Sequence, residues 1–232
     1  CTTPFFWESG NPANCGVDGL DLVSVAYDSD NTDYRVALAY DVGDSSMIYG
    51  QFSTGYKAGG NNARPFFPSQ LNAFDPETLD SIELGWKSTF GGNVRFNAAV
   101  FTNDYQDIQL PATVCLWAPP GQQSPCASQN NVGDADVWGG EVEVEWHITD
   151  ALQIDASYSK LDFEYTRIDP GATNVTLSMV APYRPEDKAS IGIQYAFALS
   201  GGGTFTPRLD AAYTDAVYAS AVNAPTNFID SY

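Results

Sequence analysis

Three glutamates alternate with valines in the segment 139–146, and their spacing is the one most suited to chemistry. On a β-strand, Glu141, Glu143 and Glu145 would share one face, with successive carboxylates about 6.6–7 Å apart. That separation falls within the range for an inverting glycosidase pair. No nucleophile or oxyanion arrangement accompanies them, and the chain has one histidine, His147, which leaves triad chemistry unsupported. We therefore predict that the protein is not an enzyme.

Metal and cofactor motifs are equally incomplete. The acidic segment 28–33 lacks the glycine and the later glutamate of an EF-hand loop, so a solvated loop is the simpler interpretation. None of the cysteines has C-x-x-C spacing, and His147 alone cannot complete a zinc site. The glycines at 59–60 and 201–203 precede no helix, which argues against a phosphate cradle. Neither a metal nor a cofactor is predicted.

Composition excludes further classes of protein. The 232 residues carry a formal net charge of -19, which argues against nucleic acid as a partner because phosphate binding needs a basic surface. An aromatic content of 13% is too high for a disordered chain. No run of 18 apolar residues exists, so a transmembrane helix is excluded. No signal-peptide pattern opens the chain, and we expect a mature protein or a piece of a longer one.

Strict alternation of apolar and polar residues predicts eight strands and no amphipathic helix. The predicted strands are 33–42, 46–57, 81–90, 93–101, 141–148, 152–158, 188–197 and 204–213. Tight turns near 43–45, 91–92, 149–150 and 200–203 alternate with long connections near 58–77, 110–132, 167–186 and 219–227. In an up-and-down meander, all tight turns would lie at one end of the sheet and all long loops at the other. Outer-membrane barrels show this asymmetry, with short periplasmic turns and longer extracellular loops.

The two faces of these strands differ in polarity. The apolar rows occupy even numbers from Tyr34 to Tyr158 and odd numbers from Ile191 to Tyr213, and they end in aromatic residues, as membrane-interface girdles do. We predict that the polar face borders a wet lumen, with the wall residues Glu83, Lys87, Arg95, Glu141, Glu143, Glu145, His147, Asp155, Arg208 and Asp210. Alternation does not say what the apolar face touches, so a soluble lectin-like β protein remains an alternative.

The parity slips once within a strand. Leu161, Phe163 and Tyr165 are apolar at odd positions, after Ile154 and Tyr158 at even ones. A slip of one residue moves side chains to the opposite face. We interpret it as the place where the strand leaves the lipid band and projects above it.

The four cysteines form two close pairs in loop-like segments. Cys1 lies near Cys15, and Cys115 lies near Cys126. We predict two local disulfides, which would require an oxidising compartment. Spacing alone does not fix pairing, so four free thiols remain the alternative.

Two segments, 49–62 and 74–110, resemble the C-terminal half of the barrel in TonB-dependent outer-membrane receptors. The family's strand-start pattern is matched by Pro76, Glu77, Ser81, Glu83, Gly85 and Lys87. A later pattern is matched by Phe101, Tyr105, Asp107 and Ile108, and the segment 131–146 is similar to the family's continuation. The resemblance runs from about Tyr34 to the end of the chain.

The resemblance implies an active importer in the bacterial outer membrane. Such a protein has a 22-stranded barrel, plugged by an N-terminal domain and energised through TonB. Residues 1–232 would be a barrel segment, with the plug and the last strands absent. Its partners would be outer-membrane lipid, the rest of its own barrel, the TonB complex through the missing N-terminal part, and a scarce nutrient. That nutrient would be a siderophore or other metal chelate, a vitamin or a glycan. A passive porin-like or structural barrel is the alternative within membranes.

Ligand contacts are expected on the long-loop side. Phe66, Phe67, Tyr105 and Trp117 are aromatic residues that exposed loops rarely keep without a role. A disulfide that shapes a loop in advance lowers the ordering cost of binding, which favours Trp117 inside the loop 115–126. Packing of each loop on itself is the alternative.

Overall fold

The computed structural model describes residues 26–232, apart from 63, 113–114, 116–117, 125, 127 and 173–174. This part of the chain is built of β-strands and two short 3-10 helices, η2 (Pro68–Gln70) and η3 (Pro225–Asn227). No helix among these residues has the length and apolar character to cross a membrane. The strands are β1 (Arg35–Asp41), β2 (Ser46–Lys57), β3 (Gly60–Asn61), β4 (Ala73–Phe74), β5 (Glu77–Phe90), β6 (Val94–Ala112), β7 (Ser128–His147), β8 (Leu152–Ile168), β9 (Asp187–Tyr195), β10 (Phe197–Ala198), β11 (Thr204–Phe205), β12 (Arg208–Thr214), β13 (Val217–Tyr218) and β14 (Phe228–Ile229).

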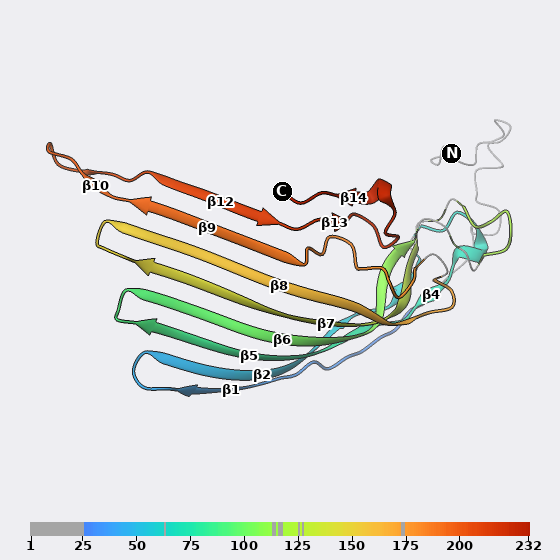
Figure 1. Cartoon of the computed structure of the whole chain (residues 1–232). Coiled ribbons are helices and arrows are strands. Elements are labelled where there is room, and N and C mark those ends of the chain that lie inside the picture. The colour runs from blue at the N-terminus through green and yellow to red at the C-terminus, as the bar shows by residue number, and fades with distance from the viewer. Residues whose placement is uncertain are drawn as a thin grey trace.

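Eight strands form one antiparallel sheet in the order β1-β2-β5-β6-β7-β8-β9-β12. Every long strand pairs with its neighbour in the chain, so the predicted up-and-down meander is confirmed. Figure 1 shows the tight turns at one end of this curved sheet and the long connections at the other. Two two-stranded pairs, β3–β4 and β13–β14, were not predicted, and a third, β10–β11, forms the end of the hairpin predicted around the turn 200–203. The long connection predicted at 110–132 is also shorter than expected, because β6 extends to Ala112 and β7 starts at Ser128.

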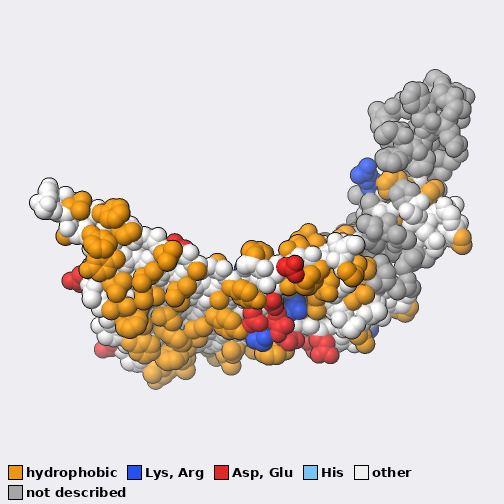
Figure 2. All heavy atoms as spheres, turned by 45° about the horizontal axis from the view of Figure 1, so that its top comes forward, with side chains coloured by type: hydrophobic (Ala, Val, Ile, Leu, Met, Phe, Trp, Pro, Cys, Tyr) orange, Lys and Arg blue, Asp and Glu red, His pale blue; other side chains and the backbone are white. Residues whose placement is uncertain are grey.

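The apolar face of the sheet is one continuous surface. Cross-strand pairing aligns Trp86 with Ala98, Ala98 with Val142, and Val142 with Tyr158. Leu38, on β1, keeps 78% of its surface exposed, which no core residue would do. Figure 2 shows hydrophobic side chains spread over this face of the sheet, with no second layer among the described residues. A sandwich would cover such apolar rows with a second sheet, and the described residues supply none.

The parity slip in β8 has a different physical form from the one expected. The β7–β8 register is unbroken from Gln153 to Tyr165, so Leu161, Phe163 and Tyr165 lie on the same face as Glu141. The strand contains no bulge here that would exchange its two faces. Instead, the face that carries Glu141, called the inward face below, changes from polar to apolar side chains, and the face with the apolar rows is called the outward face. The outward face changes in the opposite direction, with one cross-strand row made of Asp80, Asp104, Asp136 and Glu164. A charged outward row is what we expect where strands leave a lipid band, and that interpretation stays a prediction.

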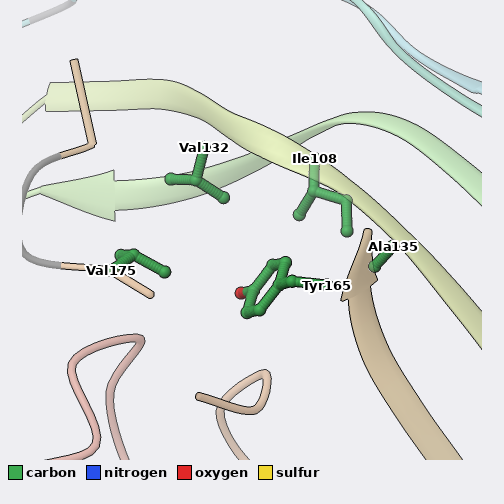
Figure 3. Close-up of a cluster of buried hydrophobic side chains, with 5 residues drawn as sticks. All are labelled: Ile108, Val132, Ala135, Tyr165 and Val175. Carbon is green, nitrogen blue, oxygen red and sulfur yellow. The ribbon is translucent and has the colours of Figure 1, made fainter. Parts of the chain in front are cut away.

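The inward apolar residues form a small core at the long-loop end. Tyr165 is 1% exposed and packs among Ile108, Val132, Ala135 and Val175, as Figure 3 shows. Part of the segment after β8 folds back to supply Val175. This core fixes the bases of the long loops.

Candidate functional site

Two long connections pack together at this end of the sheet. The side chain of Gln70 is fully buried, and its Nε2 donates to the backbone oxygen of Gln122 at 3.0 Å. Ser69 Oγ donates to Oε1 of the same Gln122 at 2.7 Å. The second loop is closed by a disulfide between Cys115 and Cys126, with the Cα atoms 5.5 Å apart. The predicted pairing of these two cysteines is confirmed, whereas Cys1 and Cys15 lie outside the described residues.

Gln109 holds the bases of these connections. Its side chain is buried, and Nε2 donates to the backbone oxygens of Ala58 and Asp75, each at 3.0 Å. Its backbone N–H donates to Glu77 Oε2 at 2.7 Å. Asn131 Nδ2 also donates to the Asp75 oxygen, at 2.9 Å. Strands β2, β5, β6 and β7 are therefore tied together where the loops leave the sheet.

Arg167 forms a second anchor, on β8. Its Nε donates to Asp134 Oδ2 at 2.6 Å, its Nη2 donates to Asp107 Oδ1 at 2.7 Å, and its Nη1 pairs with Asp169. The Arg167 hydrogen bond holds the pKa of the Asp134 carboxyl below its usual range, with a smaller lowering from the Asp107 backbone N–H, while burial opposes both. Asp107 adopts a φ of +54° at a break in the β6–β7 register. Sequence reasoning missed this anchor.

The predicted ligand residues lie at this end but in different settings. Phe66 and Phe67 are half-buried in the loop before η2, and the Arg64 guanidinium lies 5.7 Å from the centre of the Phe66 ring. Tyr105 projects from the inward face of β6 and packs against the core of Figure 3. Burial raises the pKa of Tyr105, and the nearby charge of Glu77 raises it further. Trp117 lies outside the described residues.

All ten residues predicted to line a lumen lie on one face of the sheet, opposite the apolar rows; that this face borders a lumen stays a prediction. The register aligns Arg95 with Glu145 and Glu145 with Asp155, and the same alternation continues along each strand. Glu145 accepts from Arg95 Nη1 at 2.9 Å and lies 3.1 Å from His147 Nε2. Gln153 Nε2 lies 3.3 Å from Glu145 as well. This carboxylate is held by its neighbours as part of a hydrophilic wall.

A second charged group lies farther around the same face. Arg208 binds both carboxylate oxygens of Asp155, at 2.7 and 2.8 Å, and also contacts Asp210 at 2.6 Å. A separate hydrogen bond joins β2 and β5, where the Tyr49 hydroxyl donates to Glu83 Oε1 at 2.7 Å. Within the described residues, no group of three or more histidine, cysteine, aspartate or glutamate side chains could hold a metal ion. These ion pairs and hydrogen bonds make the inward face suited to contact with water or with a polar protein surface.

Comparisons with known proteins agree with this architecture. The family model described as "TonB dependent receptor-like, beta-barrel" matches residues 8–232. The Acinetobacter baumannii protein named "Probable TonB-dependent siderophore receptor PiuA" is 25% identical over 214 residues, which cover 88% of this chain and 27% of that protein. The "Ferrioxamine B receptor" of Salmonella typhimurium is 25% identical over 169 residues, covering 72% of this chain and 21% of that protein. The chain thus spans about a quarter of the length of these relatives.

Solved structures show the same fold. The ferric yersiniabactin uptake receptor FyuA from Yersinia pestis superposes with a TM-score of 0.69 at 21% identity, covering 85% of this chain and 28% of that one. The siderophore receptor PiuA from Acinetobacter baumannii gives a TM-score of 0.60 at 21% identity, covering 86% of this chain and 28% of that one.

Proposed function

The chain belongs to the TonB-dependent receptors, as part of their outer-membrane β-barrel, and from this premise we propose that the whole protein imports a ferric siderophore. The observation that carries the proposal is the match to PiuA, which extends over 88% of this chain. The similarity to a ferrioxamine B receptor and to a ferric yersiniabactin uptake receptor supports the same class of substrate. An iron chelate is therefore favoured over a vitamin or a glycan.

In this proposal the two faces of the sheet contact different surroundings. The exposed apolar rows contact membrane lipid, and the inward face with its ten wall residues borders the lumen. The remainder of the protein supplies the other barrel strands, the N-terminal plug and the segment that contacts TonB. TonB then provides the energy that a passive channel lacks.

The chelate would be captured at the long-loop end. We assign Phe66, Phe67 and Trp117 to its contacts from the loops, and Tyr105 from the inward face of β6. The Cys115–Cys126 bridge and the Gln70–Gln122 hydrogen bond support this assignment because they hold the two loops together before binding. A preorganised site loses less conformational entropy when the ligand arrives.

The test is uptake by the full-length protein in a bacterial host that lacks its own siderophore receptors. Radioactive iron would be supplied as hydroxamate, catecholate and mixed-ligand chelates, with labelled cobalamin and an oligosaccharide as comparison substrates. We expect at least one iron chelate to accumulate, and to stop accumulating when the host's TonB is deleted.

Two results would overturn the proposal. Accumulation of cobalamin or the oligosaccharide, with no iron chelate taken up, would assign another nutrient. Uptake that is unchanged in the TonB-deleted host would indicate a passive channel.

A further inference from the structure

The last tight connection is longer than the other short turns. A cross-strand row joins Trp146, Ile154, Ile193 and Leu209. From this row β7 pairs for one more residue, His147, before its turn. The strand after Ile193 instead continues through β10, turns at 199–203 and returns through β11. Figure 1 shows this hairpin extending beyond the other tight turns.

One side of this hairpin is aromatic and exposed. The centre of the Phe197 ring lies 4.5 Å from the centre of the Tyr195 ring and 6.4 Å from the centre of the Phe205 ring, so the three rings lie on the same side of the hairpin. Phe197, Leu199 and Phe205 are 49%, 51% and 59% exposed. The partners Ala198 and Thr204 point to the opposite side, because they form the next cross-strand pair.

The composition of the hairpin also sets it apart. No charged residue occurs between Gln194 and Arg208. Two of the other tight turns carry an aspartate, Asp44 and Asp150, as expected for turns in water. A protruding strand pair with exposed aromatic residues and no charge is poorly suited to the aqueous periplasm, because exposed apolar patches favour association.

The aromatic side continues the lipid-facing surface. Ile191, Ile193 and Tyr195 on β9 are 52%, 41% and 41% exposed and belong to the outward apolar rows. The contact between Tyr195 and Phe197 carries that surface past the end of β9. In Figure 2 the hydrophobic side chains likewise extend along this face toward the tip of the hairpin.

We propose that the hairpin 196–206 is seated in the inner leaflet of the outer membrane, with Phe197, Leu199 and Phe205 in the phospholipid interface. The short turns of this family face the periplasm, so the adjoining lipid is the inner-leaflet phospholipid. Aromatic side chains are favoured at that depth, where the ring is buried and the backbone stays near the headgroups. The opposite side, with Ala198 and Thr204, faces water.

Spin labelling of the full-length receptor in phospholipid vesicles tests this placement. Single cysteines would be introduced as Leu199→Cys and Phe205→Cys, with Ala198→Cys and Thr204→Cys as controls on the opposite side. The background carries serine at the native cysteines, and the Cys115–Cys126 bridge lies at the other end of the sheet. The vesicles contain phosphatidylethanolamine and phosphatidylglycerol.

Collision of each nitroxide with oxygen and with a water-soluble nickel complex reports its surroundings. At positions 199 and 205 we expect oxygen collisions to exceed nickel collisions several-fold, and at 198 and 204 the reverse. High nickel access at all four positions would place the hairpin in water. Shielding from both reagents would show that protein covers the aromatic side, and either result overturns the proposal.

Discussion

Arg208 on β12 and Asp155 on β8 form a bidentate ion pair across the intervening strand β9 on the inward face, with nitrogen–oxygen distances of 2.7 and 2.8 Å. The pair passes directly over Gly192, where an added Cβ would lie 2.1 Å from Arg208 Nη2 and 2.7 Å from Asp155 Oδ2. A side chain at this position would require the ends of Arg208 and Asp155 to move from their present places. Gly192 therefore keeps open the space in which strands β8 and β12 are bridged.

The first prediction concerns this glycine. Gly192→Ala should separate the ion pair and lower the temperature at which the full-length barrel unfolds, because a charge-assisted, bidentate interaction is lost. The shift from the compact to the unfolded band on a heated gel measures this. Gly201→Ala is the matched control, since an added Cβ there meets no atom within 4 Å. Equal melting of G192A and the unchanged protein would contradict the account.

The second prediction concerns acid. Because Arg167 lowers the pKa of Asp134 in the folded state, that carboxylate stabilises the fold fully above its unfolded pKa of about 4. The contribution is lost as the pH falls through the lower, folded value. Asp134→Asn should therefore lower the urea midpoint at neutral pH and have little effect in strong acid.

The urea midpoints of D134N and of the unchanged protein, measured over a pH series, should differ at neutral pH and become equal in strong acid. Asp136→Asn, two residues along the same strand, controls for removal of an acidic residue. A difference between D134N and the unchanged protein that persists at the lowest pH would show that Arg167 does not act through the Asp134 charge.

The third prediction concerns the disulfide. Replacing both Cys115 and Cys126 with serine should loosen the loop that holds Gln122, and with it the contacts to Ser69 and Gln70. Chymotrypsin should then cut faster after Phe66 in the neighbouring loop; the bond after Phe67 is not a site, because Pro68 follows it.

Cleavage after Tyr183, an exposed residue in a different connection, is the internal control and should not change. Mass spectrometry of a digestion time course gives both rates. Unchanged cleavage after Phe66 would show that the two loops are ordered independently.

The strands and their faces could be predicted because alternation is local. Val142 and Val144 beside Glu143 and Glu145 already separate the two faces, and antiparallel pairing preserves that separation across the sheet. The Cys115–Cys126 disulfide could be predicted for the same reason, because both cysteines lie in one short loop.

The anchors at the long-loop end could not be predicted in this way. Arg167 meets Asp107 and Asp134 only because β6, β7 and β8 lie side by side in register. The change of polarity at Leu161 was visible in the sequence, but its meaning depended on whether the backbone carried a bulge there. The interruption near Pro207 was also not anticipated, although proline cannot donate to a β-ladder.

The most direct test of the whole account is a charge placed on either face at the same level of the barrel. Val144 lies on the outward face, opposite Ala156, and Ser157 lies on the inward face, opposite Glu143. The free energy of unfolding of the full-length protein in vesicles would be measured for Val144→Arg and Ser157→Arg. We predict that V144R costs about 2–4 kcal/mol, as arginine does near the bilayer midplane, and that S157R costs much less. Equal costs, or a larger cost for S157R, would contradict the assignment of the apolar face to lipid.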